Sequence, residues 1–318
     1  MPDALKDEQE LSAPGAQPDQ RTALWLRGAP ALFLLLWSLG FPVAKIGVAH
    51  ADPITFLALR YALVLAVLLP LFAWLRPPLP KRGRDWLHLA VVGFLIQAVY
   101  FGLCYTAFAF GISAGLLALV VSLQPILVAL LAPAFVGEAI GGRRWIGFAL
   151  GFAGAAIVIL GQSTVETPSA IAMACVVGAL FGITGATLYE KRFGATHHPV
   201  TANFVQYAVG LLATLPLAYA LEPMRVDWTG EMIAALAYLV IGNSLIAITL
   251  LLAMIRHGEA SRVSALFYLV PPSAALLAWL LIGEAMPPLA WVGMAVAAAG
   301  VVLISRPGKG LRRSARRA

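Results

Sequence analysis

The chain has 318 residues, of which 61% are hydrophobic and only 12% are charged, and its mean hydropathy is +0.87. Soluble globular domains are about 45–50% apolar and about 25% charged, so this composition excludes a soluble domain and indicates a protein that lies in lipid. The net charge is +7, but the basic residues are scattered along the chain, which argues against a nucleic-acid partner.

Residues 1–28 are acidic and polar, and we interpret them as a cytosolic tail because they lack the basic start and apolar core of a cleaved signal peptide. A bilayer core of about 30 Å requires about 20 apolar residues per helix, and ten apolar segments follow. We therefore predict an all-α, polytopic membrane protein with ten transmembrane helices. The predicted spans are 29–49, 53–74, 87–109, 113–136, 145–161, 169–189, 200–221, 231–254, 260–282 and 288–305.

The basic residues predict the orientation of these spans, because cytoplasmic loops retain Lys and Arg. If the N-terminus lies inside, nearly every Lys and Arg outside the spans is cytoplasmic, with Arg225 as the exception. We therefore expect a multi-pass protein of the cell (inner) membrane with both termini in the cytoplasm. Residues 306–318 form a basic cytosolic tail, which we expect to lie on anionic lipid headgroups.

Residues 29–161 and 169–305 match one another when the chain is shifted by 146 positions, the difference between 138 and 284. Glu138 then aligns with Glu284, and Tyr61 with Tyr207. Each copy holds an odd number of spans, so the second copy enters the membrane inverted. Inverted repeats are the usual architecture of secondary transporters, with a central cavity at the repeat interface. Exchanging the conformations of the two copies would open the cavity to each side in turn.

Prolines interrupt the fourth and ninth spans at equivalent positions, Pro125 and the pair Pro271 and Pro272. Each proline frees a backbone carbonyl, and in hydrocarbon a freed group is tolerated only against protein or a watery cavity. We interpret these prolines as helix breaks beside the cavity, with a simple packing kink as the alternative.

Two basic residues lie within spans. Arg60 is about two turns into the second helix, where a charge is expensive and by default functional, so it could bind a carboxylate or phosphate. The alternatives are extension towards the surface or pairing with Asp52. Lys45 lies nearer the surface, where extension into water competes with a role in the cavity.

Other polar and aromatic side chains of the spans are candidates for the cavity lining, each with interhelical hydrogen bonding as the alternative. Gln97 and Asn243 are repeat partners. The full set, besides Arg60 and Lys45, is Trp37, Gln97, Tyr100, Tyr105, Ser122, Gln124, Asn203, Gln206, Tyr207, Asn243, Ser244 and Tyr268.

The fifth and tenth spans contain no ionisable residue and carry small residues four positions apart, a spacing typical of close helix packing. We assign these spans to the scaffold, or to a homodimer contact if the protein is not a monomer. The residues concerned are Gly147, Gly151, Gly293 and Ala297.

The remaining acidic and nucleophilic residues do not predict an enzyme. Glu138 and Glu284 fall in loops on opposite membrane faces, so we expect turn and cap roles for them. The spans show no nucleophile with a base and no metal-ligand spacing, so we expect neither a cofactor nor a metal. No Asp or Glu lies near the centre of a span, which favours a facilitator or exchanger over a proton-driven carrier.

Several segments resemble the drug/metabolite transporter superfamily in its EamA-type, ten-helix branch. Trp37, Gly40, Phe41 and Lys45 resemble its first-helix pattern, although Ser38 and Leu39 stand between Trp and Gly. Residues 113–160 and 260–305 resemble its fourth and fifth, and its ninth and tenth, helices. The resemblance implies a helical basket around a central cavity that exports amino acids or related zwitterionic or anionic metabolites by alternating access. The alternatives are a channel-like facilitator and, further off, an intramembrane enzyme.

Overall fold

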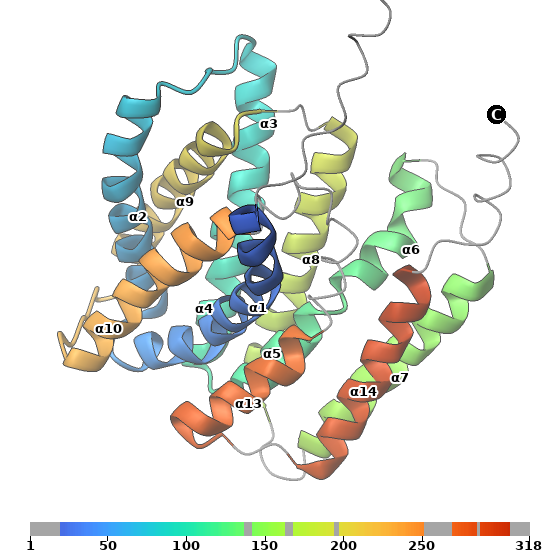
Figure 1. Ribbon diagram of the computed structural model, residues 1–318. Coiled ribbons are helices and arrows are strands. Elements are labelled where there is room, and N and C mark those ends of the chain that lie inside the picture. Colours follow the sequence, from blue (N-terminus) through green and yellow to red (C-terminus); the bar gives the residue numbers. More distant parts are fainter. Residues whose placement is uncertain are drawn as a thin grey trace, which may run out of the picture.

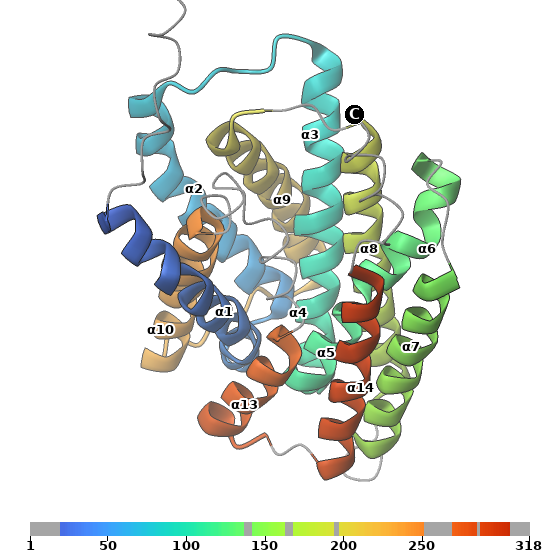
Figure 2. The ribbon, with the colours of Figure 1, turned by 45° about the vertical axis from the view of Figure 1, so that its right-hand side comes forward.

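A computed structural model describes residues 20–136, 142–162, 168–193, 197–250, 269–284 and 287–305. Within this part of the chain the secondary structure is helical, and the single extended pairing is an antiparallel bridge between Ala51 and Val226. The helices form a bundle (Figures 1 and 2). The all-α, polytopic fold class predicted from composition is therefore confirmed.

The first half of the chain contributes eight helical segments to the bundle, one of them a π-helix, η1. They are α1 (Gln20–Ala49), α2 (Pro53–Leu75), α3 (Gly83–Gly93), η1 (Phe94–Tyr100), α4 (Phe101–Ala109), α5 (Ala114–Val121), α6 (Gln124–Val136) and α7 (Gly142–Gln162).

The described residues of the second half contribute six, again with one π-helix, η2. They are α8 (Ala170–Phe193), α9 (Pro199–Leu221), α10 (Gly230–Tyr238), η2 (Leu239–Ala247), α13 (Val270–Ile282) and α14 (Pro288–Ser305).

Each predicted span overlaps an apolar helical segment, but the segments differ in length. Four shorter apolar segments are Ala114–Val128, Ala149–Val158, Val270–Ile282 and Pro288–Gly300, and the count of ten spans remains a prediction. Six are long and apolar enough to cross a membrane: Gly28–Ala49, Pro53–Leu75, Gly83–Ala109, Ala170–Phe193, Pro199–Leu221 and Gly230–Leu250.

The two halves meet where α2 packs against α9. Both helices begin with a proline, Pro53 and Pro199, whose fixed φ suits the first helical position. The rings of the repeat partners Tyr61 and Tyr207 pack against each other in a tilted arrangement across this contact, with centroids 5.6 Å apart. Residues that the repeat relates are thus direct neighbours at the centre of the bundle.

The π-helices also fall at equivalent positions. Shifting η1 by the repeat offset of 146 places it inside η2, with Gln97 on Asn243. A π-turn inserts one extra residue into a helix, turns the following side chains to a new direction, and is frequent at functional sites. Both halves therefore re-aim their side chains at the same depth.

The α7 and α14 helices lie side by side at the edge of the bundle (Figures 1 and 2). A Cβ on Gly154 would fall 2.3 Å from the Ala297 backbone nitrogen, and one on Gly300 would fall 2.5 Å from that of Gly151. Gly147 and Gly293 lie in the same contact. The four small residues assigned to scaffold packing thus lie where these two backbones approach each other.

The predicted helix breaks fall at helix ends in the described part of the chain. The α5 helix ends at Val121 and α6 begins at Gln124, directly before Pro125. Pro271 and Pro272 lie in the first turn of α13. Residues 251–268, which include the predicted cavity residue Tyr268, lie outside the described part of the chain.

Candidate functional site

Arg60 is the charged residue that the fold buries most completely among the described residues, at 2% exposure. It is buried because α2 turns the same face inwards with Phe56, Leu57 and Val64, all of which are 0% exposed. These residues lie four and three positions before Arg60 and four after it, so they share one side of the helix. The buried face of α2 is therefore apolar except for one positively charged side chain, that of Arg60.

The guanidinium of Arg60 is held by three neutral side chains. Its Nη1 donates to the Tyr105 hydroxyl at 2.8 Å. Its Nη2 donates to Ser244 Oγ at 2.9 Å and Asn243 Oδ1 at 3.2 Å, and Nε donates to Ser244 Oγ at 3.3 Å. The Phe101 ring lies over the cation, with its centroid 5.0 Å away, a cation–π contact that adds attraction.

No carboxylate of the described residues forms an ion pair with Arg60. A guanidinium has five N–H groups, and the four hydrogen bonds above leave one N–H on Nη1 free for another acceptor. Burying a charge without a counter-ion costs several kcal/mol, and a bound anion offsets that cost. The arrangement suits an anionic ligand group.

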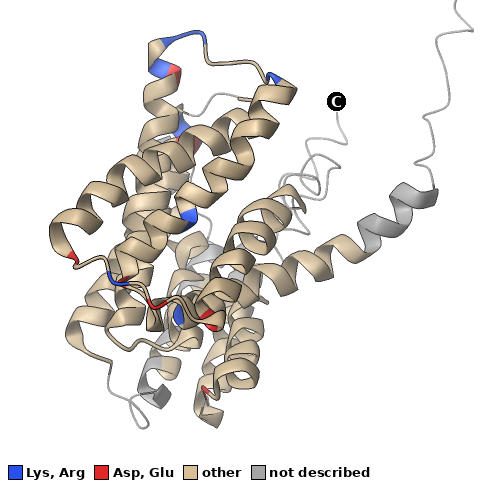
Figure 3. Cartoon of the chain, turned by 90° about the vertical axis from the view of Figure 1, so that its left-hand side faces the viewer, with Lys and Arg blue, Asp and Glu red and all other residues tan. Residues whose placement is uncertain are grey.

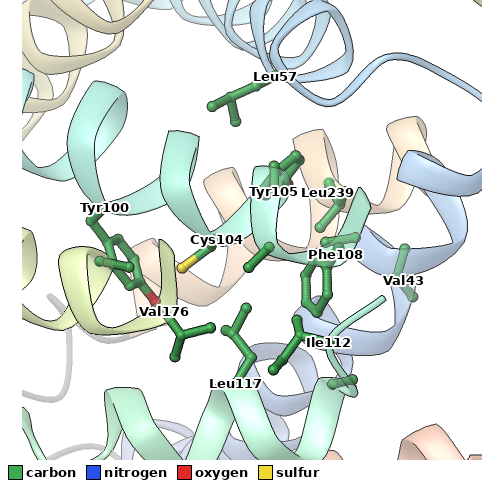
Figure 4. Packing of buried hydrophobic residues seen from close by; sticks show 14 of the residues in the cluster. Val43, Leu57, Tyr100, Cys104, Tyr105, Phe108, Ile112, Leu117, Val176 and Leu239 are labelled. Carbon is green, nitrogen blue, oxygen red and sulfur yellow. The ribbon is translucent and has the colours of Figure 1, made fainter. Parts of the chain in front are cut away.

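A small cavity of about 40 Å³ adjoins Arg60. That volume holds a few water molecules but falls well short of the roughly 300 Å³ of small-molecule pockets, so an organic solute requires the cavity to widen. Figure 4 shows Tyr105, Phe108 and Leu239 gathered in this part of the core. The lining residues are Trp37, Gly40, Phe41, Ala44, Arg60, Tyr100, Phe101, Cys104, Tyr105, Phe108, Leu117, Leu239 and Asn243.

Next to the lining residue Ala44, Lys45 of α1 forms an ion pair with Glu284, just after α13. The second Glu284 oxygen accepts a hydrogen bond from the Ala114 backbone N–H at 2.8 Å, at the first turn of α5. Glu284 thus has the cap role expected from its loop position and also joins three helices. The ammonium of Lys45 is held in this ion pair, and Lys45 is not part of the cavity lining.

Of the predicted cavity residues, the structure brings six together. Trp37, Tyr100, Tyr105 and Asn243 line the cavity beside Arg60, and Ser244 bonds the guanidinium directly.

The other predicted cavity residues lie elsewhere. Gln97 is buried with its Oε1 unpaired among the described residues, while its backbone carbonyl accepts from Tyr61 at 2.7 Å. Ser122 donates to the Leu119 carbonyl and Gln124 to Thr187 Oγ1, which are structural hydrogen bonds. The remaining described members, Asn203, Gln206 and Tyr207, are on α9.

Sequence reasoning missed the phenylalanines of the lining, above all Phe101 and Phe108. A signal for them exists in the sequence. The i, i+3, i+4, i+7 spacing of one helix face relates Phe101, Cys104, Tyr105 and Phe108. The prediction that Tyr105 lines the cavity therefore also indicates that the other three residues face it.

The fold and the site together define a multi-pass membrane protein with a buried polar site at its centre. Comparison with known proteins gives the family: the model of the EamA-like transporter family matches residues 27–160 and 168–306. The chain therefore belongs to the EamA-like transporter family. It is a membrane transporter and not an enzyme.

Individual relatives align with this chain over most of its length. A "Probable terminal-alkyne amino-acid exporter" of Streptantibioticus cattleyicolor is 30% identical, covering 92% of this chain and 96% of its own. An "Uncharacterized inner membrane transporter YedA" of Escherichia coli K12 is 26% identical, covering 90% and 92%. A solved structure titled "Crystal structure of protein" aligns with a TM-score of 0.62 at 18% identity, over 87% of this chain and 98% of its own, which shows a shared fold.

Proposed function

We propose that this transporter exports small metabolites that carry a carboxylate, amino acids first among them, by alternating access, and that Arg60 binds the carboxylate. The observation that carries the proposal is the buried guanidinium with only neutral partners. The amino-acid exporter named among the relatives supports the choice of amino acids as the first class to test.

The geometry of the arginine supports this role. Tyr105, Asn243 and Ser244 fix the plane of the guanidinium and leave one Nη1 N–H for a carboxylate oxygen, which would form a charge-assisted hydrogen bond. The aromatic lining, with Trp37 and Tyr100, would cover the rest of a small solute. An amino acid would thus add an ionised acceptor to the neutral ones.

The small volume of the cavity supports alternating access, because an organic solute requires the cavity to widen. We propose that both termini are cytoplasmic, as the Lys and Arg distribution favours, so the Lys45–Glu284 ion pair lies towards the external side. Release to the outside would then require this ion pair to open and the cavity to widen. A carrier of this kind binds its solute in one closed site and opens to each side in turn.

The test is counterflow in proteoliposomes that hold the purified protein and an excess of unlabelled amino acid. A panel of radiolabelled amino acids outside the vesicles should show saturable, trans-stimulated uptake for at least one member. Arg60→Gln should abolish this uptake. Arg225→Gln, at an exposed arginine outside the cavity, is the matched control and should keep it.

Two outcomes would overturn the proposal. Equal counterflow by Arg60→Gln and the wild type would remove the arginine from the site. Uptake that neither saturates nor responds to internal solute would indicate a channel-like facilitator instead of a carrier.

A further inference from the structure

A second hollow lies between α2, α3 and α9, near the loop that joins α2 to α3. Its volume is about 510 Å³, and it shares no lining residue with the Arg60 cavity. Every residue that lines it is apolar: Phe72, Leu79, Trp86, Leu87, Ala90, Phe204, Val205, Ala208 and Val209. We call it the α2–α9 groove.

The shape of the α2–α9 groove follows from its side chains. Phe72 and Phe204 pack with ring centroids 4.7 Å apart, and the small side chains of Ala90 and Ala208 leave the space beside them open. Leu79 and Leu87 are 54% and 59% exposed. The groove is therefore open to the surroundings of the bundle.

The loop beside the groove is held in place. The Thr201 hydroxyl donates to the Pro78 carbonyl at 3.1 Å, and the Trp86 indole N–H donates to the Pro80 carbonyl at 3.0 Å. Tryptophan with a bonded N–H and a partly exposed ring is typical of the membrane–water boundary. The bonded, partly exposed Trp86 therefore favours a position of the groove's mouth at that boundary.

Four basic residues lie on the loop between α2 and α3 and in the first turn of α3, the same segments that contribute Leu79 and Trp86 to the groove: Arg76, Lys81, Arg82 and Arg84. All four are exposed, and none forms an ion pair within the described part of the chain. Figure 3 shows Lys and Arg, with an acidic residue beside them, at one end of a bundle whose helices are otherwise nearly free of charge. An apolar groove with unpaired cations at its mouth matches a molecule with an apolar tail and an anionic head.

We propose that the α2–α9 groove binds one acyl chain of an anionic phospholipid, whose phosphate lies against Lys81, Arg82 and Arg84. Basic sites between transmembrane helices bind lipid headgroups, at about a five-fold gain in affinity per base near the surface. The groove fixes the position of the lipid, because a bound acyl chain fills empty apolar space and gains packing contacts with the groove. The site does not depend on the transported solute.

Native mass spectrometry of the purified full chain, titrated with phosphatidylglycerol or phosphatidylcholine, tests the proposal. The wild type should retain phosphatidylglycerol at least ten-fold more tightly. The combined variant K81Q/R82Q/R84Q should lose most of this preference. Ala208→Phe, which fills the groove without changing charge, should weaken phosphatidylglycerol binding at least five-fold, and Ala90→Leu is a milder version of the same change.

The matched control is R312Q/R313Q/R316Q, which removes three charges from the last segment of the chain and should keep the preference. An equal loss in this control would show diffuse attraction of lipid by charge and overturn the site. Unchanged phosphatidylglycerol binding by both Ala208→Phe and Ala90→Leu would also overturn it. Thermal unfolding in detergent identifies any variant whose fold is damaged, and lipid binding is compared among the folded variants.

Discussion

Replacing Gly40 with alanine should disturb the site while leaving the fold intact. A Cβ on Gly40 would fall 2.4 Å from Asn243 Nδ2 and 3.3 Å from its Cγ. Because the close atom is the end of a side chain, the Asn243 amide can rotate away without moving a backbone. It would then leave the Arg60 guanidinium, to which its Oδ1 is bonded at 3.2 Å.

The size of the effect follows from this geometry. Ordinary contact needs about 1 Å more separation than the substitution allows, which takes the Asn243–Arg60 hydrogen bond beyond its usual range. A hydrogen bond to a charged group contributes about 1.5–3 kcal/mol, and 1.4 kcal/mol corresponds to a ten-fold change in affinity. We therefore expect the KM of the transported amino acid to rise at least ten-fold.

Counterflow kinetics in proteoliposomes measure this KM, and thermal unfolding in detergent measures the fold. Gly102→Ala is the matched control, because Gly102 is also helical but a Cβ there would meet nothing within 4 Å. Alanine is the better helix former by about 1 kcal/mol, so Gly102→Ala should be at least as stable as the wild type, and in Gly40→Ala this gain offsets part of the lost hydrogen bond, so the protein should still fold. The reasoning fails if Gly40→Ala transports with the wild-type KM.

Two further substitutions test the contacts around the site and the scaffold. Glu284→Ala removes both the ion pair with Lys45 and the acceptor for the Ala114 N–H, and should lower the free energy of unfolding by about 1–2 kcal/mol; Glu284→Gln keeps an acceptor and should lose less. Gly154→Ala forces a Cβ against the Ala297 backbone nitrogen at 2.3 Å, and should destabilise by about 3 kcal/mol, because a backbone cannot rotate away. Thermal unfolding in detergent measures both, and equal stability of either alanine variant and the wild type would contradict its prediction.

Much of the fold could be predicted from the sequence because a lipid bilayer restricts which segments of a chain can cross it. Apolar segments of about 20 residues predict spans, and Pro125 predicted the interruption between α5 and α6. The position of Arg60 inside a span also predicted a polar site, because a cation surrounded by lipid or protein needs hydrogen-bond partners. Tyr105, Asn243 and Ser244 were expected as polar candidates and do surround it.

The features that sequence could not predict are those that depend on contacts between distant segments. Lys45 and Glu284 are 239 positions apart, and only the packing of α1 on α13 makes them a pair. Both π-helices change the direction of side chains without any local sequence signal. Gln97 and Asn243, which the repeat makes equivalent and which both lie in π-helices, still have different surroundings: Asn243 lines the cavity, and Gln97 does not.

The central claim is that Arg60 binds the carboxylate of the transported solute. Equilibrium binding of one transported amino acid and of its carboxamide, to the wild type and to Arg60→Gln, tests this most directly. If the guanidinium meets the carboxylate, the wild type should prefer the acid at least ten-fold, and the variant should bind acid and amide equally. The same preference for the acid in both proteins would place the carboxylate elsewhere and contradict the account.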